Sequence, residues 1–138
     1  MKWLALTATL VGGSFAASAN AYEITRVIDG DTVEIAVDFL PKPLPPKLSI
    51  RVIGVDTPEK APRAKCEAEA KRAVEATRFT QRAVAEAKEV NIHIKSWDKY
   101  GGRVLGMVVL DGRGLSEMLI EAGLARPYKG EAKSSWCE

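Results

Sequence analysis

A long run of helix-forming residues separates two groups of strand-like segments in this chain of 138 residues. Residues 64–88 are rich in Ala, Glu, Lys and Arg and contain no Gly or Pro, so they predict one long helix. The composition typical of strands is found before this run in residues 23–29, 32–37 and 48–55, and after it in residues 90–95 and 103–110. A shorter helix is expected over residues 115–122, where Gly123 can end it.

The first three strands follow one another without an intervening helix, so consecutive members cannot pair in parallel. Five strands with two helices placed in this way fit a small five-stranded barrel, of mainly β or α+β class, better than a doubly wound sheet. Residues 38–46 hold four of the seven prolines and predict a stiff, exposed loop. The buried side of the long helix is expected to carry a stripe made of Cys66, Ala70, Ala73, Val74, Thr77 and Val84.

The first 21 residues have the composition of a secretory signal peptide. Lys2 supplies the basic start, residues 3–17 are apolar or small, and Ala19-Asn20-Ala21 matches a cleavage site. We therefore expect a signal peptide over residues 1–21 and one domain over residues 22–138, exported to the periplasm or secreted. The alternatives are an N-terminal anchor or a buried strand. After cleavage we expect a monomer without stable membrane association.

Composition does not by itself indicate a nucleic-acid-binding protein. The net charge is +2 and falls to +1 once Lys2 is removed with the signal peptide. Binding of phosphates would therefore depend on positive charges that gather at one site.

Two cysteines, Cys66 and Cys137, lie in the expected mature chain. An even number of cysteines in an exported protein favours a disulfide, with two free thiols as the alternative. The bridge would tie the tail near Trp136 to the start of the long helix, and Trp136 is expected to pack beside Cys137.

Acidic residues and one arginine cluster at the ends of the first strands. Residues 29–31 place two aspartates around a glycine, Arg51 lies in the third strand, and residues 56–59 add an aspartate and a glutamate. Clustered carboxylates suit a hard divalent cation, and a guanidinium suits a phosphate. Together they are the parts of a site that cleaves phosphodiesters. The plainer alternatives are a turn shaped by the aspartates, a helix start at Glu59, and a salt bridge from Arg51 to Asp56 or Glu59.

Three segments carry a resemblance to a known family. Residues 27–32 (VIDGDT), 51–59 (RVIGVDTPE) and 98–103 (DKYGGR) resemble the staphylococcal nuclease (thermonuclease) family, and the resemblance runs from about residue 23 to about residue 128. It implies an OB-fold barrel and an exported, Ca²⁺-dependent endonuclease that hydrolyses DNA, with RNA as a further substrate, and leaves 3′-phosphate ends. The alternative is a non-catalytic OB-fold module that binds nucleic acid or a protein partner.

The resemblance also assigns roles to individual residues. The catalytic residues it implies are Arg51, Glu59 and Arg103. The Ca²⁺ ligands it implies are Asp31, Asp56 and the carbonyl of Thr57, with Asp29 acting through a water. The substrate-binding residues are Lys99, Tyr100 and Tyr128. The chain departs from the family pattern at Gly101 and Gly102, because the familiar pattern has one glycine between the tyrosine and the arginine.

Overall fold

The computed structural model describes residues 22–99 and 101–138. The predicted signal peptide and Tyr100, one of the predicted substrate-binding residues, lie outside the described residues. The long strands are β1 (Ile24–Asp29), β2 (Thr32–Ala36), β3 (Lys47–Val52), β5 (Val90–Trp97) and β6 (Arg103–Leu110). The helices are α1 (Glu67–Glu86) and α2 (Leu115–Glu121), and the short strands are β4 (Val55–Asp56), β7 (Arg113–Gly114) and β8 (Arg126–Pro127). Neither α1 nor α2 has the length and hydrophobicity of a membrane-spanning helix.

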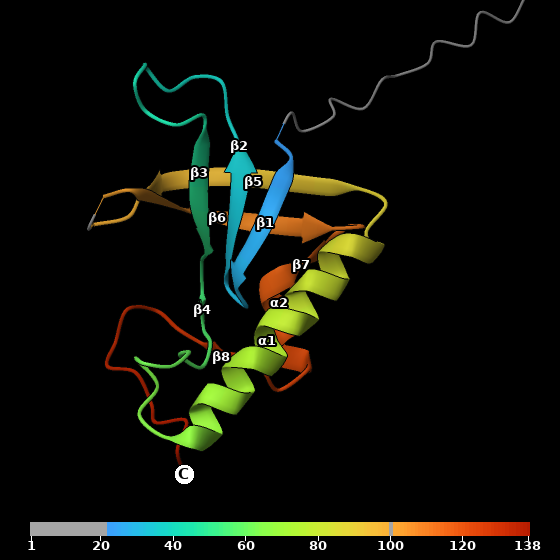
Figure 1. Ribbon diagram of the computed structural model, residues 1–138. Coiled ribbons are helices and arrows are strands. Elements are labelled where there is room, and N and C mark those ends of the chain that lie inside the picture. The colour runs from blue at the N-terminus through green and yellow to red at the C-terminus, as the bar shows by residue number, and fades with distance from the viewer. Residues whose placement is uncertain (1–21, 100) are drawn as a thin grey trace, which may run out of the picture.

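The five long strands form one twisted sheet in the order β1-β2-β3-β6-β5. The pairs β1–β2 and β2–β3 are antiparallel, as predicted from the absence of helices between these strands. The pair β5–β6 is also antiparallel, whereas β3 and β6 pair in parallel. In Figure 1, β5 and β6 cross behind β1, β2 and β3. The α+β class and the placement of both helices are therefore confirmed.

The predicted barrel is not closed. Within the described residues the sheet runs from β1 to β5 without a ladder that joins these two edge strands. Two register shifts interrupt β1, between Ile24 and Arg26 and between Val27 and Asp29. Such irregularities bend a strand and disturb its pairing. Helix α1 packs against β1 (Figure 1).

The hydrophobic core lies between the concave face of the sheet and α2. Alternate residues of the strands point inward, so Val33, Ile35 and Ile50 are fully buried and meet Leu115 and Leu119 of α2. Each such side chain contributes roughly 1.5–3 kcal/mol through its burial. The strand register near the site is thereby fixed, since a slip by one residue would expose the whole inward set.

Helix α1 is packed closely against the turn between β1 and β2. A Cβ atom on Gly30 would lie 2.7 Å from Cβ of Ala76, so no larger residue fits there. Thr80 Oγ1 donates a hydrogen bond of 2.7 Å to the carbonyl of Gly30. This contact selects the buried face of α1: Ala73 and Thr77 are buried as predicted, but Val74 is exposed. The turn that carries Asp29 and Asp31 is therefore fixed to the helix.

The C-terminal tail, residues 128–138, lies beside the start of α1 (Figure 1). Strands β4 and β8 pair with Asp56 opposite Arg126, which places the tail next to residues 56–59. At the far end, Cys137 Sγ lies 2.10 Å from Cys66 Sγ, at bonding distance, as expected for the predicted bridge. Trp136, the residue before Cys137, is buried. The tail is therefore held at its start by the pairing of β8 with β4 and at its end by Trp136 and the bridge.

Candidate active site

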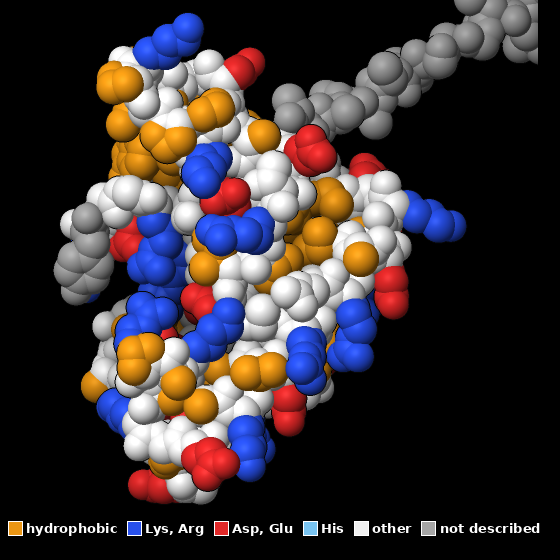
Figure 2. Space-filling view, viewed as in Figure 1, with side chains coloured by type: hydrophobic (Ala, Val, Ile, Leu, Met, Phe, Trp, Pro, Cys, Tyr) orange, Lys and Arg blue, Asp and Glu red, His pale blue; other side chains and the backbone are white. Residues whose placement is uncertain are grey.

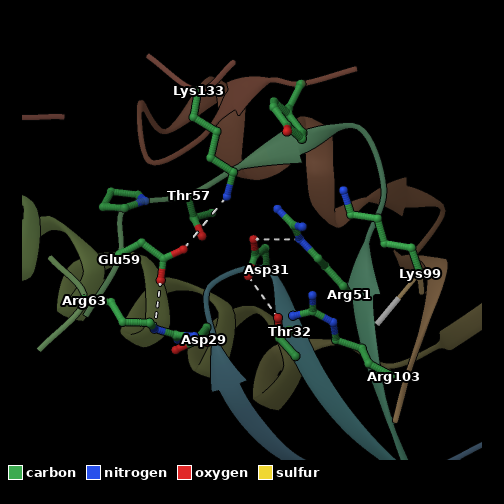
Figure 3. A pocket seen from close by; sticks show the side chains of 12 residues that line it. Asp29, Asp31, Thr32, Arg51, Thr57, Glu59, Arg63, Lys99, Arg103 and Lys133 are labelled. Atoms are coloured by element: carbon green, nitrogen blue, oxygen red, sulfur yellow. Dashed lines mark hydrogen bonds and ion pairs between the residues drawn. The ribbon is translucent and has the colours of Figure 1, made fainter. Parts of the chain in front are cut away.

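A pocket of about 290 Å³ opens where β2, β3, the segment after β4, the start of β6 and the tail meet (Figure 3). Its lining includes five basic and three acidic residues. The full lining is Asp29, Asp31, Thr32, Arg51, Thr57, Pro58, Glu59, Arg63, Lys99, Arg103, Tyr128 and Lys133. Figure 2 shows Lys and Arg side chains gathered, with acidic ones among them, on the side of the molecule where β3 and β4 lie in Figure 1. A protein with little net charge thus concentrates cations at one place.

Asp31 and Arg51 lie next to each other because of the strand register. Thr32 pairs with Arg51 across β2 and β3, so the preceding aspartate comes beside the arginine. Arg51 Nε lies 3.6 Å from Asp31 Oδ2, and Thr32 Oγ1 donates to Asp31 Oδ1 at 3.0 Å. Arg51 does form an ion pair, but its partner is Asp31 and not Asp56 or Glu59, which the sequence suggested as alternatives.

Arg103 begins β6 and points into the same pocket as Arg51 (Figure 3). The parallel register pairs Ser49 with Arg103 and Arg51 with Leu105, so the two arginines are diagonal neighbours on one face of the sheet. Arg103 Nε donates to Asp98 Oδ2 at 2.7 Å. This hydrogen bond lowers the pKa of the Asp98 carboxyl below its ordinary value, against the opposing effect of burial.

The additional glycine before Arg103 is accommodated by the turn. Gly101 and Gly102 have φ values of 72° and 69°, in the left-handed region that favours glycine. The amide of Gly101 donates to the carbonyl of Asp98 at 2.9 Å, which closes the turn. The inserted residue is absorbed there, and Arg103 still lines the pocket.

Glu59 lines the pocket from the segment between β4 and α1, and its side chain is 39% exposed. Helix α1 begins only at Glu67, so Glu59 is not a helix-start residue. Arg63 Nε lies 3.4 Å from Glu59 Oε2. Asp29, at the end of β1, lies nearby and pairs with Lys60 Nζ at 3.1 Å. Glu59 and Asp29 therefore both lie at the pocket, as predicted, and each has a cationic partner.

Asp56 and Thr57 are both 5% exposed. Thr57 lines the main pocket, whereas Asp56 lines an adjoining cavity of about 60 Å³ together with Thr57, Glu59 and Lys133. Asp56 Oδ1 lies 3.0 Å from Lys133 Nζ, and Asp56 Oδ2 accepts a hydrogen bond of 3.1 Å from Trp136 Nε1. Both carboxylate oxygens of Asp56 thus interact with the tail.

The donor set suits a hard cation with few protein ligands. Within residues 22–99 and 101–138, no three or more His, Cys, Asp or Glu residues are grouped to hold a metal. The buried carboxylates of Asp31 and Asp56 and the carbonyl of Thr57 are all oxygen donors, which Ca²⁺ prefers. Ca²⁺ coordination is flexible and can be completed by water and phosphate oxygens. The residues present therefore fit such an ion, although they do not form a complete protein cage.

Two of the predicted substrate-binding residues also reach the pocket. Lys99 and Tyr128 line it, and the Arg51 guanidinium lies 6.0 Å from the centre of the Tyr128 ring. Lys99 and Tyr128 also line a larger groove of about 700 Å³. This groove includes Trp97, whose side chain is exposed. The pocket is therefore continuous with a wider, more apolar surface.

Sequence reasoning missed four residues that shape the site, namely Arg63, Asp98, Lys133 and Trp136. Asp98 belongs to the segment 98–103, so its spacing from Arg103 could have revealed the pair. Arg63 follows Glu59 by four residues, a spacing typical of ion pairs along a helical turn. Lys133 has no motif around it, and only the expected bridge from Cys137 hinted that the tail comes close.

The chain is similar to a known protein family and to individual known proteins. The family model described as staphylococcal nuclease homologue matches residues 49–136. The thermonuclease of Staphylococcus hyicus is 35% identical over 112 residues, which cover 80% of this chain and 60% of that protein. Protein ParB of Escherichia coli is 26% identical over 144 residues, which cover 98% of this chain and 72% of ParB. The chain thus spans less than two thirds of the S. hyicus protein. Since the family match extends over more than half of its residues, this chain belongs to the family of staphylococcal nuclease homologues.

Proposed function

We propose that this protein is an exported, Ca²⁺-dependent endonuclease that hydrolyses phosphodiester bonds of DNA, with RNA as a second substrate, and leaves 3′-phosphate ends. The observation that carries the proposal is the pocket in which Arg51, Arg103 and Glu59 meet. Two guanidinium groups and a carboxylate around one cavity are suited to a phosphate and an attacking water. Family membership supports the same activity.

The two arginines bind and polarise the phosphate in this mechanism. Each guanidinium donates hydrogen bonds to the non-bridging oxygens, where negative charge increases toward the transition state. Asp31 and Asp98 orient the two side chains before substrate arrives, so little ordering is required at the moment of reaction. The arginines therefore lower the barrier more than they tighten ground-state binding.

Glu59 serves as the general base. Its carboxylate accepts a proton from the water whose oxygen attacks phosphorus, and the bond from phosphorus to the 5′ oxygen breaks. The bonding electron pair leaves with the 5′ oxygen, which takes a proton from solvent. Arg63 Nε, 3.4 Å from Glu59 Oε2, holds the carboxylate at the pocket.

Asp31, Asp56 and the Thr57 carbonyl would hold Ca²⁺, with Asp29 contributing through water. The ion would neutralise charge on the phosphate and act as a Lewis acid. Lys99, Tyr128 and Tyr100 are assigned to the nucleotide around the scissile phosphate, through a charge contact and stacking. Residues 1–21 are assigned to an export signal, and the bonding distance between Cys66 and Cys137 supports an oxidising compartment.

The test is cleavage of denatured and duplex DNA by residues 22–138 in Ca²⁺, in Mg²⁺ and in chelator. Arg51→Ala is expected to remove most of the activity, whereas Arg82→Ala, which changes an exposed arginine on α1, is the matched control. Ca²⁺-dependent cutting that is lost only in Arg51→Ala is the expected result. A folded protein that binds nucleic acid but never cuts it would instead be the non-catalytic binding module.

A further inference from the structure

Lys133 brings a side-chain cation directly onto Asp56, one of the residues assigned to the metal. Its Nζ lies 3.0 Å from Asp56 Oδ1 and 3.9 Å from Glu59 Oε1. The ammonium group also lies 5.5 Å from the centre of the Tyr128 ring. In Figure 3, Lys133 points from the tail toward Thr57 and Glu59. One ammonium group therefore stands between the carboxylate assigned to the metal and the carboxylate assigned as base.

The tail that carries Lys133 is built into the structure. Trp136 is buried, and the Arg126 guanidinium lies 3.9 Å from the centre of its ring. Arg126 Nη1 also donates to the carbonyl of Ser135 at 2.7 Å. With Cys137 at bonding distance from Cys66, the segment that follows Lys133 has a fixed position. Lys133 is therefore held over Asp56 by packing rather than by the chance position of a free chain end.

The Lys133 side chain can leave Asp56 without disturbing the tail. It is 40% exposed, and the ammonium is carried by four flexible methylene groups. Asp56, in contrast, is fixed, because its second oxygen accepts the hydrogen bond from the buried Trp136 indole. The movable partner of this ion pair is thus the lysine.

We propose that the Lys133 ammonium is the cation paired with Asp56 when no metal is bound, and that a divalent ion must displace this ammonium to bind Asp56. This inference rests on the proposed function, in which Asp56 is a metal ligand. The ammonium stabilises the carboxylates when no metal is bound and opposes metal binding by repulsion and by competition for Asp56 Oδ1. The coupling is reciprocal, so a bound ion weakens the Lys133 contact as much as Lys133 weakens the ion.

The experiment compares Lys133→Met and Lys133→Gln with the wild type and with Lys88→Met. Lys88 is exposed beyond the far end of α1, so its substitution changes net charge equally without touching the site. Ca²⁺ affinity is measured by calorimetry at low salt, and thermal melting is measured in chelator. We expect both Lys133 variants to bind Ca²⁺ about tenfold more tightly and to melt at a lower temperature without metal, as the charges predict. Lys88→Met should match the wild type in both measurements.

Equal Ca²⁺ affinity in the wild type and both Lys133 variants would overturn this inference and leave the proposed metal site intact. Absence of Ca²⁺ binding in every variant would overturn the inference together with the Ca²⁺ dependence. Binding by the variants but not by the wild type would support it, since Lys133 would then exclude the ion. Lys133→Arg should retain the wild-type affinity, because it keeps the charge.

Discussion

Asp98 fixes the guanidinium of Arg103 at the edge of the pocket, with Arg103 Nε 2.7 Å from Asp98 Oδ2. The Asp98 side chain is only 8% exposed, and its backbone amide donates to the carbonyl of Arg103 at 2.9 Å. The pair therefore closes the turn between β5 and β6 twice, through the side chains and through the backbone. The orientation of a proposed phosphate ligand thus depends on an acid five positions earlier.

Replacing Asp98 with Asn should reduce cleavage through Arg103. The amide cannot form the charged hydrogen bond, so the guanidinium loses its fixed orientation toward the phosphate. Displacement of such a group by about 1 Å can cost roughly a hundredfold in rate. We expect kcat/KM for DNA to fall about 10- to 100-fold, while Asp38→Asn in the exposed loop leaves it unchanged. An unaltered rate in Asp98→Asn would mean that the orientation of Arg103 does not limit the reaction.

The same ion pair predicts how stability changes at acid pH. The hydrogen bond from Arg103 lowers the pKa of Asp98 in the folded protein below the ordinary value of 3.8. The pair therefore contributes fully above pH 3.8, and its contribution is lost as the pH falls through the lowered value. Urea unfolding followed below pH 4 should show a shallower loss of stability in Asp98→Asn than in the wild type. Parallel curves for the two proteins would contradict this.

Replacing Glu59 with Gln should strongly reduce the rate of DNA cleavage and leave the affinity for DNA unchanged. The amide is similar in shape but cannot accept a proton from water, and loss of a general base typically costs roughly 10²–10⁴ in rate. The measurement pairs single-turnover cleavage with DNA affinity determined by fluorescence anisotropy. Glu75→Gln on the exposed side of α1 is the control. A variant that binds poorly and still cuts at the wild-type rate once saturated would exclude Glu59 as the base.

Replacing Trp136 with Phe removes the indole donor from Asp56. The smaller phenyl ring keeps an aromatic group in the buried site, but Asp56 Oδ2 loses its 3.1 Å hydrogen bond. An unsatisfied buried acceptor costs roughly 1–3 kcal/mol, and loss of a group that orients a metal ligand typically weakens affinity about 10- to 100-fold. Denaturant unfolding and Ca²⁺ calorimetry would measure the two effects. Trp97→Phe, at an exposed tryptophan, should change neither.

Reduction of the bridge between Cys66 and Cys137 should destabilise the protein and release the tail. The two residues are 71 positions apart, so the closed loop is worth about 4 kcal/mol in the chain-entropy model. We expect the double variant Cys66→Ser, Cys137→Ser to lose about this much unfolding free energy. Denaturant curves with and without reductant test it. Reductant should shift the wild-type curve and leave that of the double variant in place.

The sequence predicted those parts of the site that depend on local segments. Arg51 and Glu59 follow from residues 51–59. The direction in which the Arg51 side chain points came from the strand register of the structure, because neither face of this strand is clearly polar in the sequence. Lys133 could not be placed on Asp56, because no local motif surrounds it and its position depends on tertiary contacts of the tail, namely the burial of Trp136 and the bridge to Cys66.

Two features of the fold were also beyond the sequence pattern, for physical reasons. The barrel was expected to close, but β1 pairs with β2 through two register shifts, which hydrophobic alternation does not reveal. The exposure of Val74 was also beyond the sequence pattern, because it depends on how α1 packs. The close approach of α1 to Gly30 selects small side chains for the interface, and helical periodicity alone cannot detect that.

The parallel pairing of β3 with β6 also lets the proposed nuclease activity report on the progress of folding. Arg51 and Arg103 lie about fifty positions apart, and they meet only when that ladder forms. Ladders between distant segments form late, because the intervening chain must first lose its freedom. During refolding from denaturant, helical circular dichroism of α1 should therefore recover before nuclease activity, and the delay between the two signals would time the closing of this ladder.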